Sequence, residues 1–191
     1  MSLISLRSAC LSYGIPPLLD GVDLDIGPGE RVCLIGRNGT GKSTLLRIID
    51  GEIQPDSGER RVGQGARIAC LAQEAPAGGD ETVLDVVAGG LGELGALVGE
   101  YYRLSHRLGD VSATKGDQDA VNQAGALDRM AAIQQRLEVD GGWEIEQRAE
   151  RVISRLGLDA EVHYSTLSGG LRRRVMLARA LVIEPDLLLL D

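Results

Sequence analysis

The sequence predicts an α/β domain with a mainly helical subdomain inserted in its middle. Residues 32–35 (VCLI) form a short apolar run of strand type that leads through a glycine-rich turn into a helix-like segment. Residues 186–190 (DLLLL) contain an uninterrupted apolar run, which is expected of a parallel strand covered on both faces. Between these runs, apolar residues recur at alternating spacings of three and four over two long stretches, which is typical of helices that pack together.

Length and composition narrow the class further. With 191 residues, 43% apolar and 25% charged, the chain fits one globular domain with a smaller lobe. A net charge of −8 repels polyanions, so contact with nucleic acid would need local basic patches such as residues 60–67 and 171–180. Cys10, Cys33 and Cys70 lie in strand-like runs and are expected to be buried thiols in a reducing compartment. Because the sequence shows neither a secretory leader nor a membrane-spanning apolar run, we expect a cytoplasmic protein.

The N-terminal part contains the strongest motif. Residues 9–32 include two alternating runs that predict an antiparallel strand pair. The turn that follows the apolar run, residues 36–43 (GRNGTGKS), satisfies the pattern G-x-x-x-x-G-K-S/T. We expect Gly36, Gly39 and Gly41 to adopt positive φ, so that backbone N–H groups and the next helix N-terminus surround a phosphate.

The residues after the turn supply charge and a metal ligand. The Lys42 ammonium is expected against the β- and γ-phosphates of a nucleotide, and the Ser43 hydroxyl is expected to ligate Mg²⁺. Thr44 lies beside them in the first helical turn. The apolar spacing from Leu45 predicts a helix that ends at Gly51.

A second anion site is predicted near the other end of the chain. Ser168 lies where it can N-cap a helix over residues 169–181, which leaves the N–H groups of Gly169 and Gly170 free to face a phosphate. Taken alone, this segment fits a simple helix cap equally well. Asp191 follows the apolar run 187–190, at the carboxyl end of the expected strand, where α/β sheets bind ligands.

These two segments together resemble ATP-binding cassette proteins. Residues 164–191 are similar to the stretch that runs from the signature motif to the Walker B strand of that family, with Leu171 where Gln is usual. The resemblance implies a P-loop NTPase fold with an antiparallel β subdomain, a partial parallel-sheet core and an α-helical subdomain. It also implies that the Tyr13 ring stacks on adenine and that Gln73 reaches Mg²⁺ and the attacking water from the Q-loop.

The resemblance assigns a role to each matching residue. The implied ATP-binding residues are Tyr13, Gly36, Arg37, Asn38, Gly39, Thr40, Gly41, Lys42, Ser43 and Thr44. The implied signature residues, which face the ATP of an opposing cassette, are Ser168, Gly169 and Gly170. The implied Mg²⁺ ligands are Ser43, Gln73 and, through water, Asp191, and the implied catalytic residues are Lys42 and Gln73.

We expect the chain to be one incomplete cassette. Residues 1–75 would form the nucleotide-binding core, residues 80–165 the helical subdomain, and residues 166–191 the signature helix and Walker B strand. The family's catalytic Glu, D-loop and switch His would follow Asp191. The isolated 191 residues are therefore expected to hydrolyse ATP poorly or not at all, although the intact protein would be an ATPase.

The middle of the chain predicts an antiparallel helical hairpin over about residues 91–139. One seam comprises Leu94, Leu97, Tyr101, Leu104 and Leu108, and the other comprises Ala126, Met130, Ile133 and Leu137. The polar tip 109–119 separates two arms of about 25 Å. The hairpin is not basic, so its charge does not support direct RNA binding. A further helix over residues 143–156 is expected to end at Gly157.

Residues 141–158 resemble the ABC-F subfamily, particularly the first cassette of its Uup-like branch. Members of that subfamily lack transmembrane domains and carry the hairpin, called the arm, in the first of two cassettes. They bind the ribosome near its tRNA exit site and use ATP-dependent closure to act on translation. The resemblance therefore implies ATP and Mg²⁺ as cofactors, a second cassette and the ribosome as partners, and an ATP-driven conformational clamp as the function.

Two other functions fit the same nucleotide motifs. The alternative is the ATPase subunit of an ABC membrane transporter, which would share every one of these nucleotide motifs. A weaker alternative is a regulatory cassette without hydrolysis or a DNA-associated clamp, in which DNA would be bound through regions beyond Asp191. The sequence that follows Asp191 separates these possibilities.

Overall fold

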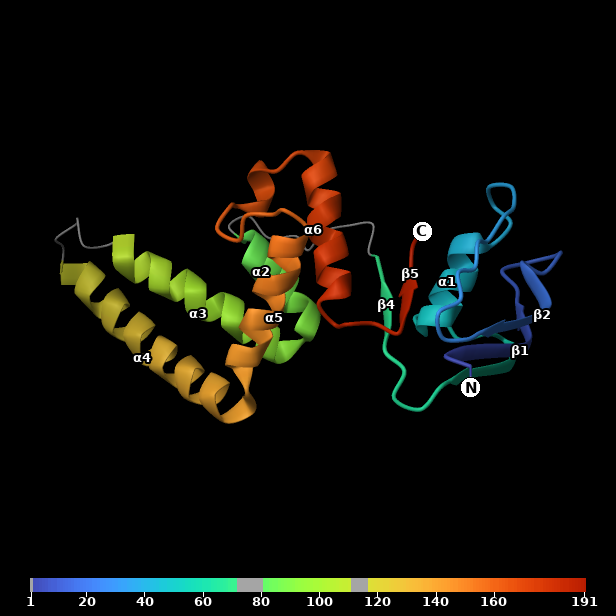
Figure 1. Ribbon diagram of the computed structural model, residues 1–191, viewed down its shortest axis with the longest axis horizontal. Coiled ribbons are helices and arrows are strands. Elements are labelled where there is room, and N and C mark those ends of the chain that lie inside the picture. Colours follow the sequence, from blue (N-terminus) through green and yellow to red (C-terminus); the bar gives the residue numbers. More distant parts are fainter. Residues whose placement is uncertain (1, 72–80, 111–116) are drawn as a thin grey trace. The chain divides into compact units, whose positions relative to one another are not determined.

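The computed structural model describes residues 2–71, 81–110 and 117–191 (Figure 1). The described residues fall into two compact units. One unit comprises Met1–Gln73 with Glu184–Asp191, and the other comprises Glu74–Ile183.

The first unit contains a three-stranded antiparallel sheet. Its strands are β1 (Ile4–Leu11), β2 (Leu19–Ile26) and β3 (Ser57–Val62), in the order β2-β1-β3. The pairing of Ile4 with Ile26 and of Leu11 with Leu19 confirms the predicted antiparallel pair. The apolar residues of the alternating pattern turn inward, and Ile4 and Leu6 are fully buried.

A glycine is required where β1 and β3 meet. The register between these strands shifts between Arg7 and Cys10, and Ser8 adopts a φ of 47° there. Gly58 has a φ of +90°, and a Cβ at this position would lie 2.4 Å from the Ser8 carbonyl oxygen. A side chain would therefore be strained by the backbone conformation and would collide with the neighbouring strand.

Helix α1 (Lys42–Asp50) packs on the sheet through Ile48 and Ile49, which are buried in the same cluster as Ile4, Leu6 and Leu189. The helix ends as predicted at Gly51, whose φ of 95° and N–H bonds to Arg47 O and Ile48 O close the last turn.

A parallel pair completes the first unit. Strand β4 (Ile68–Cys70) pairs with β5 (Leu187–Leu189), so the apolar run near the end of the chain is the predicted parallel strand. The prediction that this run is covered on both faces was wrong. Leu187 and Leu188 are half-buried and Leu190 is 59% exposed, because among the described residues β5 pairs only with β4.

The expected strand over residues 32–35 is absent. These residues have no regular secondary structure, and Val32 is 50% and Ile35 93% exposed. An apolar run becomes a strand only when a neighbouring strand satisfies its N–H and C=O groups, and no described strand pairs with this one. The expectation of buried thiols was also wrong for Cys33 and Cys70, which are exposed, whereas Cys10 is half-buried.

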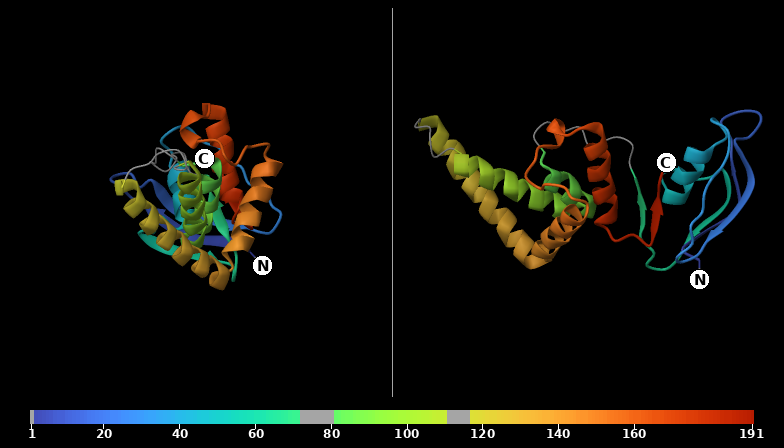
Figure 2. Two further views of the ribbon diagram at one scale, coloured as in Figure 1. Left: turned by 90° about the vertical axis from the view of Figure 1, so that its left-hand side faces the viewer. Right: turned by 45° about the horizontal axis from the view of Figure 1, so that its top comes forward.

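The second unit is helical. In chain order it contains α2 (Val83–Ala88), η1 (Gly89–Leu91), α3 (Glu93–Asp110), α4 (Asp117–Asp140), α5 (Gly142–Arg155), η3 (Tyr164–Thr166) and α6 (Gly169–Leu181). Helices α3 and α4 lie side by side as the predicted antiparallel hairpin (Figure 2). The limits of α6 coincide with the predicted range 169–181.

Apolar residues and ion pairs hold the hairpin together. Leu97 of α3 and Ile133 and Leu137 of α4 are buried, as the seam predicts. Across the exposed edge, the Arg129 guanidinium donates two hydrogen bonds of 2.7 and 2.9 Å to the Glu100 carboxylate, which lowers the pKa of that carboxyl. Residues 111–116 of the predicted polar tip lie outside the described part of the chain.

We predict that Gly58→Ala loosens the antiparallel sheet. The strained φ and the contact with Ser8 O are expected to destabilise it by at least about 2 kcal/mol. Hydrogen exchange of the β1 and β3 amides measures this loss. The matched control is Gly65→Ala, because Gly65 has a φ of +74° but open space around its Cβ position. This substitution is expected to lower the free energy of unfolding by about 1 kcal/mol. Equal exchange in both variants would contradict the steric argument.

Candidate functional site

The turn before α1 uses its glycines in two different ways. Gly39 and Gly41 adopt the predicted left-handed conformation, with φ of 83° and 89°. The prediction of positive φ was wrong for Gly36. Gly36 provides space instead, because a Cβ there would lie 2.8 Å from Thr40 Oγ1. A side chain at position 36 would therefore push against the hydroxyl that braces the turn.

Hydrogen bonds within the turn hold its shape. The Thr40 hydroxyl donates to Arg37 O at 2.8 Å, and the Thr40 N–H donates to the same oxygen at 3.3 Å. The Lys42 ammonium donates to Gly36 O at 2.8 Å and to Arg37 O at 2.9 Å. These carbonyls hold the cation above the turn, where it can exchange them for the stronger charge-assisted bonds that phosphate oxygens offer.

The N-terminus of α1 has no side-chain cap. Gly41 occupies the N-cap position, and the first helical hydrogen bond runs from Leu45 N–H to Gly41 O at 2.8 Å. The first turn contains no acidic residue, so the positive end of the helix is not neutralised locally. Ser43 is exposed and Thr44 half-buried in this turn. The arrangement can bind an anion through backbone N–H groups, the Lys42 charge and two hydroxyls.

Asp191 follows β5 in the same unit as this turn. The pairing of β5 with β4 continues beyond the strands, since Leu71 N–H donates to Leu189 O at 2.9 Å. Burial raises the pKa of the Cys70 thiol, and the nearby carboxylates of Asp50, Asp191 and Glu52 raise it further. The Asp191 carboxylate therefore acts electrostatically on the thiol of Cys70, which is the last residue of β4. Predicted site residue Gln73 lies outside the described residues.

Tyr13 lies in the loop between β1 and β2, where 72% of the residue is exposed. The Ser12 N–H fixes the start of this loop by donating to Asp56 Oδ2 at 2.8 Å. An exposed ring on a braced loop offers a face for stacking with a planar ligand.

The predicted second anion site has the expected cap. Ser168 Oγ accepts a hydrogen bond from Leu171 N–H at 3.4 Å, and Ser168 O accepts one from Arg172 N–H at 2.9 Å. A Cβ at Gly169 or Gly170 would meet no atom within 4 Å, and neither glycine has positive φ. The fold itself does not require glycine at these positions, so the bare helix start leaves room for a ligand to approach.

The sequence reasoning missed Asp85 and Arg103. Asp85 forms a capping box with Thr82 at the start of α2, and the pattern T-x-x-D before an apolar run was a signal that could have identified it. The ion pair between Asp85 and Arg103 had no such signal, because it joins two different helices.

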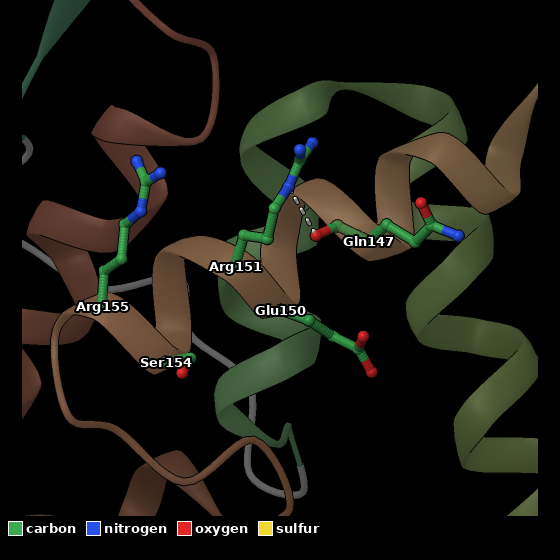
Figure 3. Close-up of a pocket in the computed structure, with 5 residues that line it drawn as sticks. All are labelled: Gln147, Glu150, Arg151, Ser154 and Arg155. Carbon is green, nitrogen blue, oxygen red and sulfur yellow. Dashed lines mark hydrogen bonds between the residues drawn. The ribbon is translucent and has the colours of Figure 1, made fainter.

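A shallow hollow lies on the exposed side of α5, outside the predicted sites. Figure 3 shows its lining residues, all from this one helix: Gln147, Glu150, Arg151, Ser154 and Arg155. Arg151 Nε donates to Gln147 O at 3.2 Å within the helix. With one helix as its only wall, the hollow does not enclose a ligand.

The glycine-rich turn, the Lys42 ammonium that it holds and the uncapped start of α1 define a P-loop nucleotide-binding domain. The chain belongs to the ATP-binding cassette family, because residues 19–191 match the family described as ABC transporter. It is similar to ATP-binding protein Uup of Haemophilus influenzae, with 41% identity over 191 residues, and of Escherichia coli, with 39%. These matches cover the whole chain and confirm the predicted resemblance to the Uup-like branch of the ABC-F subfamily.

A third relative is the energy-dependent translational throttle protein EttA of Mycobacterium tuberculosis, with 30% identity over 99% of the chain and 32% of the relative. The chain spans 28% of the length of the two Uup proteins.

Solved structures confirm the fold. An ATP-binding cassette of an ABC transporter, MJ1267, superposes with a TM-score of 0.65 at 21% identity over 98% of this chain and 68% of that chain. A metal-chelate type ABC transporter in an inward-facing conformation gives 0.62 at 23% identity, over 100% and 61%. Among the described residues, no helix combines the length and the apolar character that crossing a membrane requires.

We predict that Gly36 and Thr40 are energetically coupled in ATP binding. Gly36→Ala should weaken ATP binding about tenfold or more, because the new methyl group displaces Thr40 Oγ1. Adding Thr40→Ala removes the collision and should recover part of the affinity, which a double-mutant cycle measures. Gly39→Ala with Thr40→Ala is the control, since a Cβ at Gly39 meets nothing within 4 Å. Equal coupling in both cycles would contradict the assignment.

Proposed function

We propose that the chain is the ATP-binding half of a conformational clamp in which two cassettes close on ATP. The observation that carries the proposal is the uncapped N-terminus of α1 beneath a turn whose carbonyls hold the Lys42 ammonium. This arrangement is suited to a polyphosphate because backbone N–H groups and a mobile cation converge on one position.

Each residue of the turn has a role in this proposal. Lys42 leaves the carbonyls of Gly36 and Arg37 and pairs with the β- and γ-phosphates, while backbone N–H groups of the turn and of the first turn of α1 face the phosphates. Tyr13 stacks on adenine. Ser43, Gln73 and, through water, Asp191 would hold Mg²⁺, which would neutralise charge on the phosphates. Oxygen ligands from a hydroxyl, an amide and a carboxylate suit this hard cation.

The second anion site acts on a different nucleotide. Ser168, Gly169 and Gly170 approach the γ-phosphate of the ATP that an opposing cassette binds. Closure of the two cassettes therefore requires bound ATP, and hydrolysis of the ATP allows the cassettes to separate. The open space around both glycines supports this role, because a phosphate can reach the helix start without displacing a side chain.

We further propose that the clamp acts on translation. Support comes from the similarity to Uup and to EttA, the latter being named as an energy-dependent translational throttle protein. A transporter subunit remains the alternative, and it predicts association with membranes instead of ribosomes.

Lys42→Ala should weaken binding of a fluorescent ATP analogue about 10- to 100-fold, because the charge-assisted contacts to the phosphates are lost. Arg47→Gln is the matched control. It removes an exposed cation from the last turn of the same helix, where Arg47 pairs with Glu52 at 3.7 Å, and should leave affinity unchanged. Unchanged affinity in Lys42→Ala would count against the site.

The intact protein should co-sediment with ribosomes in the presence of ATP and not of ADP, since only the triphosphate stabilises the closed clamp. Lys42→Ala should abolish this difference. Co-flotation with membrane vesicles in place of ribosome binding would favour the transporter alternative.

A further inference from the structure

The middle of the arm helix α3 is joined to α2 by an ion pair whose carboxylate is buried. Arg103 Nη1 of α3 lies 2.9 Å from Asp85 Oδ1 of α2. The Asp85 side chain is only 3% exposed and the Arg103 side chain 39%. The contact lacks the alignment of a hydrogen bond, so Oδ1 has charge compensation but no hydrogen-bond donor. Removal of the guanidinium would leave a buried carboxylate unpaired, which proteins tolerate poorly.

The same turn of α3 is also fixed to α5. The Tyr101 ring packs edge-to-face against Trp143, with centroids 5.6 Å apart. The next residue, Tyr102, hydrogen-bonds the Glu146 carboxylate, and burial together with this contact raises the pKa of the Tyr102 phenol. Three successive residues of the arm helix therefore contact two other helices, α5 and α2.

Asp85 connects this junction to the segment that precedes the signature. Its other oxygen, Oδ2, accepts hydrogen bonds from the Thr82 N–H at 2.8 Å and the Thr82 hydroxyl at 3.0 Å. Thr82 pairs with His163 as an antiparallel bridge. On either side, Val83 N–H donates to Val162 O at 3.0 Å and Tyr164 N–H donates to Glu81 O at 2.8 Å. The start of α2 and residues 160–164 therefore form one hydrogen-bonded unit.

The last contacts reach Ser168. Tyr164 is buried, and the Arg172 guanidinium of α6 lies 5.6 Å from the centre of its ring. Arg172 Nη2 also donates to Ser165 O. Because Arg172 follows Ser168 by one helical turn, these contacts fix the position of the α6 N-terminus.

We propose that Arg103 and Asp85 are positioning residues for Ser168, which transmit the orientation of the arm to the signature end of α6. The route runs from the arm through the N-terminus of α2 and residues 160–164 to Tyr164 and Arg172. Every step is a direct contact between groups of the same unit. This inference rests on the proposed function, which assigns Ser168 to the ATP of an opposing cassette.

The test compares two ion pairs of the arm in the intact protein. Arg103→Met removes the charge that faces Asp85, whereas Arg129→Met removes the pair with Glu100, which lies within the hairpin. Hydrogen exchange of the amides at residues 165–171 should rise severalfold in Arg103→Met and stay unchanged in Arg129→Met. Steady-state kcat for ATP should fall about 3- to 30-fold, the range of coupling free energies carried by side-chain networks, with KM unchanged. Arg103→Lys keeps the charge, so it should restore most of the protection of residues 165–171 from exchange and most of kcat.

The outcomes are distinguishable. Unchanged exchange at residues 165–171 in Arg103→Met, or an equal change in Arg129→Met, overturns the positioning role. If Arg103→Met fails to fold, Asp85→Asn, which keeps the size of the side chain and removes its charge, decides by the same exchange measurement. Failure of the proposed function instead appears as a wild-type protein that binds no ATP, and the exchange result still tests the coupling.

Discussion

The constraint on which the site depends is that the first turn of α1 leaves its backbone N–H groups without a side-chain acceptor. A comparison of three helix starts among the described residues shows what this means. At α2, Thr82 and Asp85 satisfy the N-terminus reciprocally, and the helix is buried. At α6, Ser168 supplies one acceptor and the following glycines leave the surface bare. At α1, Gly41 supplies none, so the positive end of the helix is available to an anion.

The glycines of these segments differ in whether the local structure requires them. Gly39 and Gly41 are required by the left-handed backbone, and Gly36 by the position of Thr40 Oγ1. Gly169 and Gly170 satisfy neither condition. Glycine loses more conformational entropy on folding than any other residue. Where neither the backbone conformation nor a close contact within the unit requires glycine, we infer that contact with a ligand or another unit requires it. This separates the structural role of Gly36 from the proposed ligand-facing role of the α6 start.

Local patterns predicted the elements well where each element satisfies its own hydrogen bonds. The seam of the hairpin, the cap at Ser168 and the end of α1 at Gly51 are all set by residues within a few turns, and all were found. The prediction of a strand over residues 32–35 was wrong because a strand needs a neighbouring strand to pair with, and the apolar pattern of these residues does not show whether one is present. The Arg103–Asp85 pair was missed for the same reason, since the two residues meet only after α2 and α3 have packed.

Ion pairs within the unit compensate part of the positive charge of the arm. Arg129 is paired with Glu100 at 2.7 Å, Arg136 with Glu93 at 2.9 Å, and Arg103 with Asp85. Each of these three arginines is therefore matched by a carboxylate of its own unit, so its charge is partly compensated before any polyanion approaches. An arm of this kind would recognise a partner through shape and surface contacts. Its attachment at Tyr101, Tyr102 and Arg103 then matters more than its charge, because these contacts join the hairpin to α5 and α2.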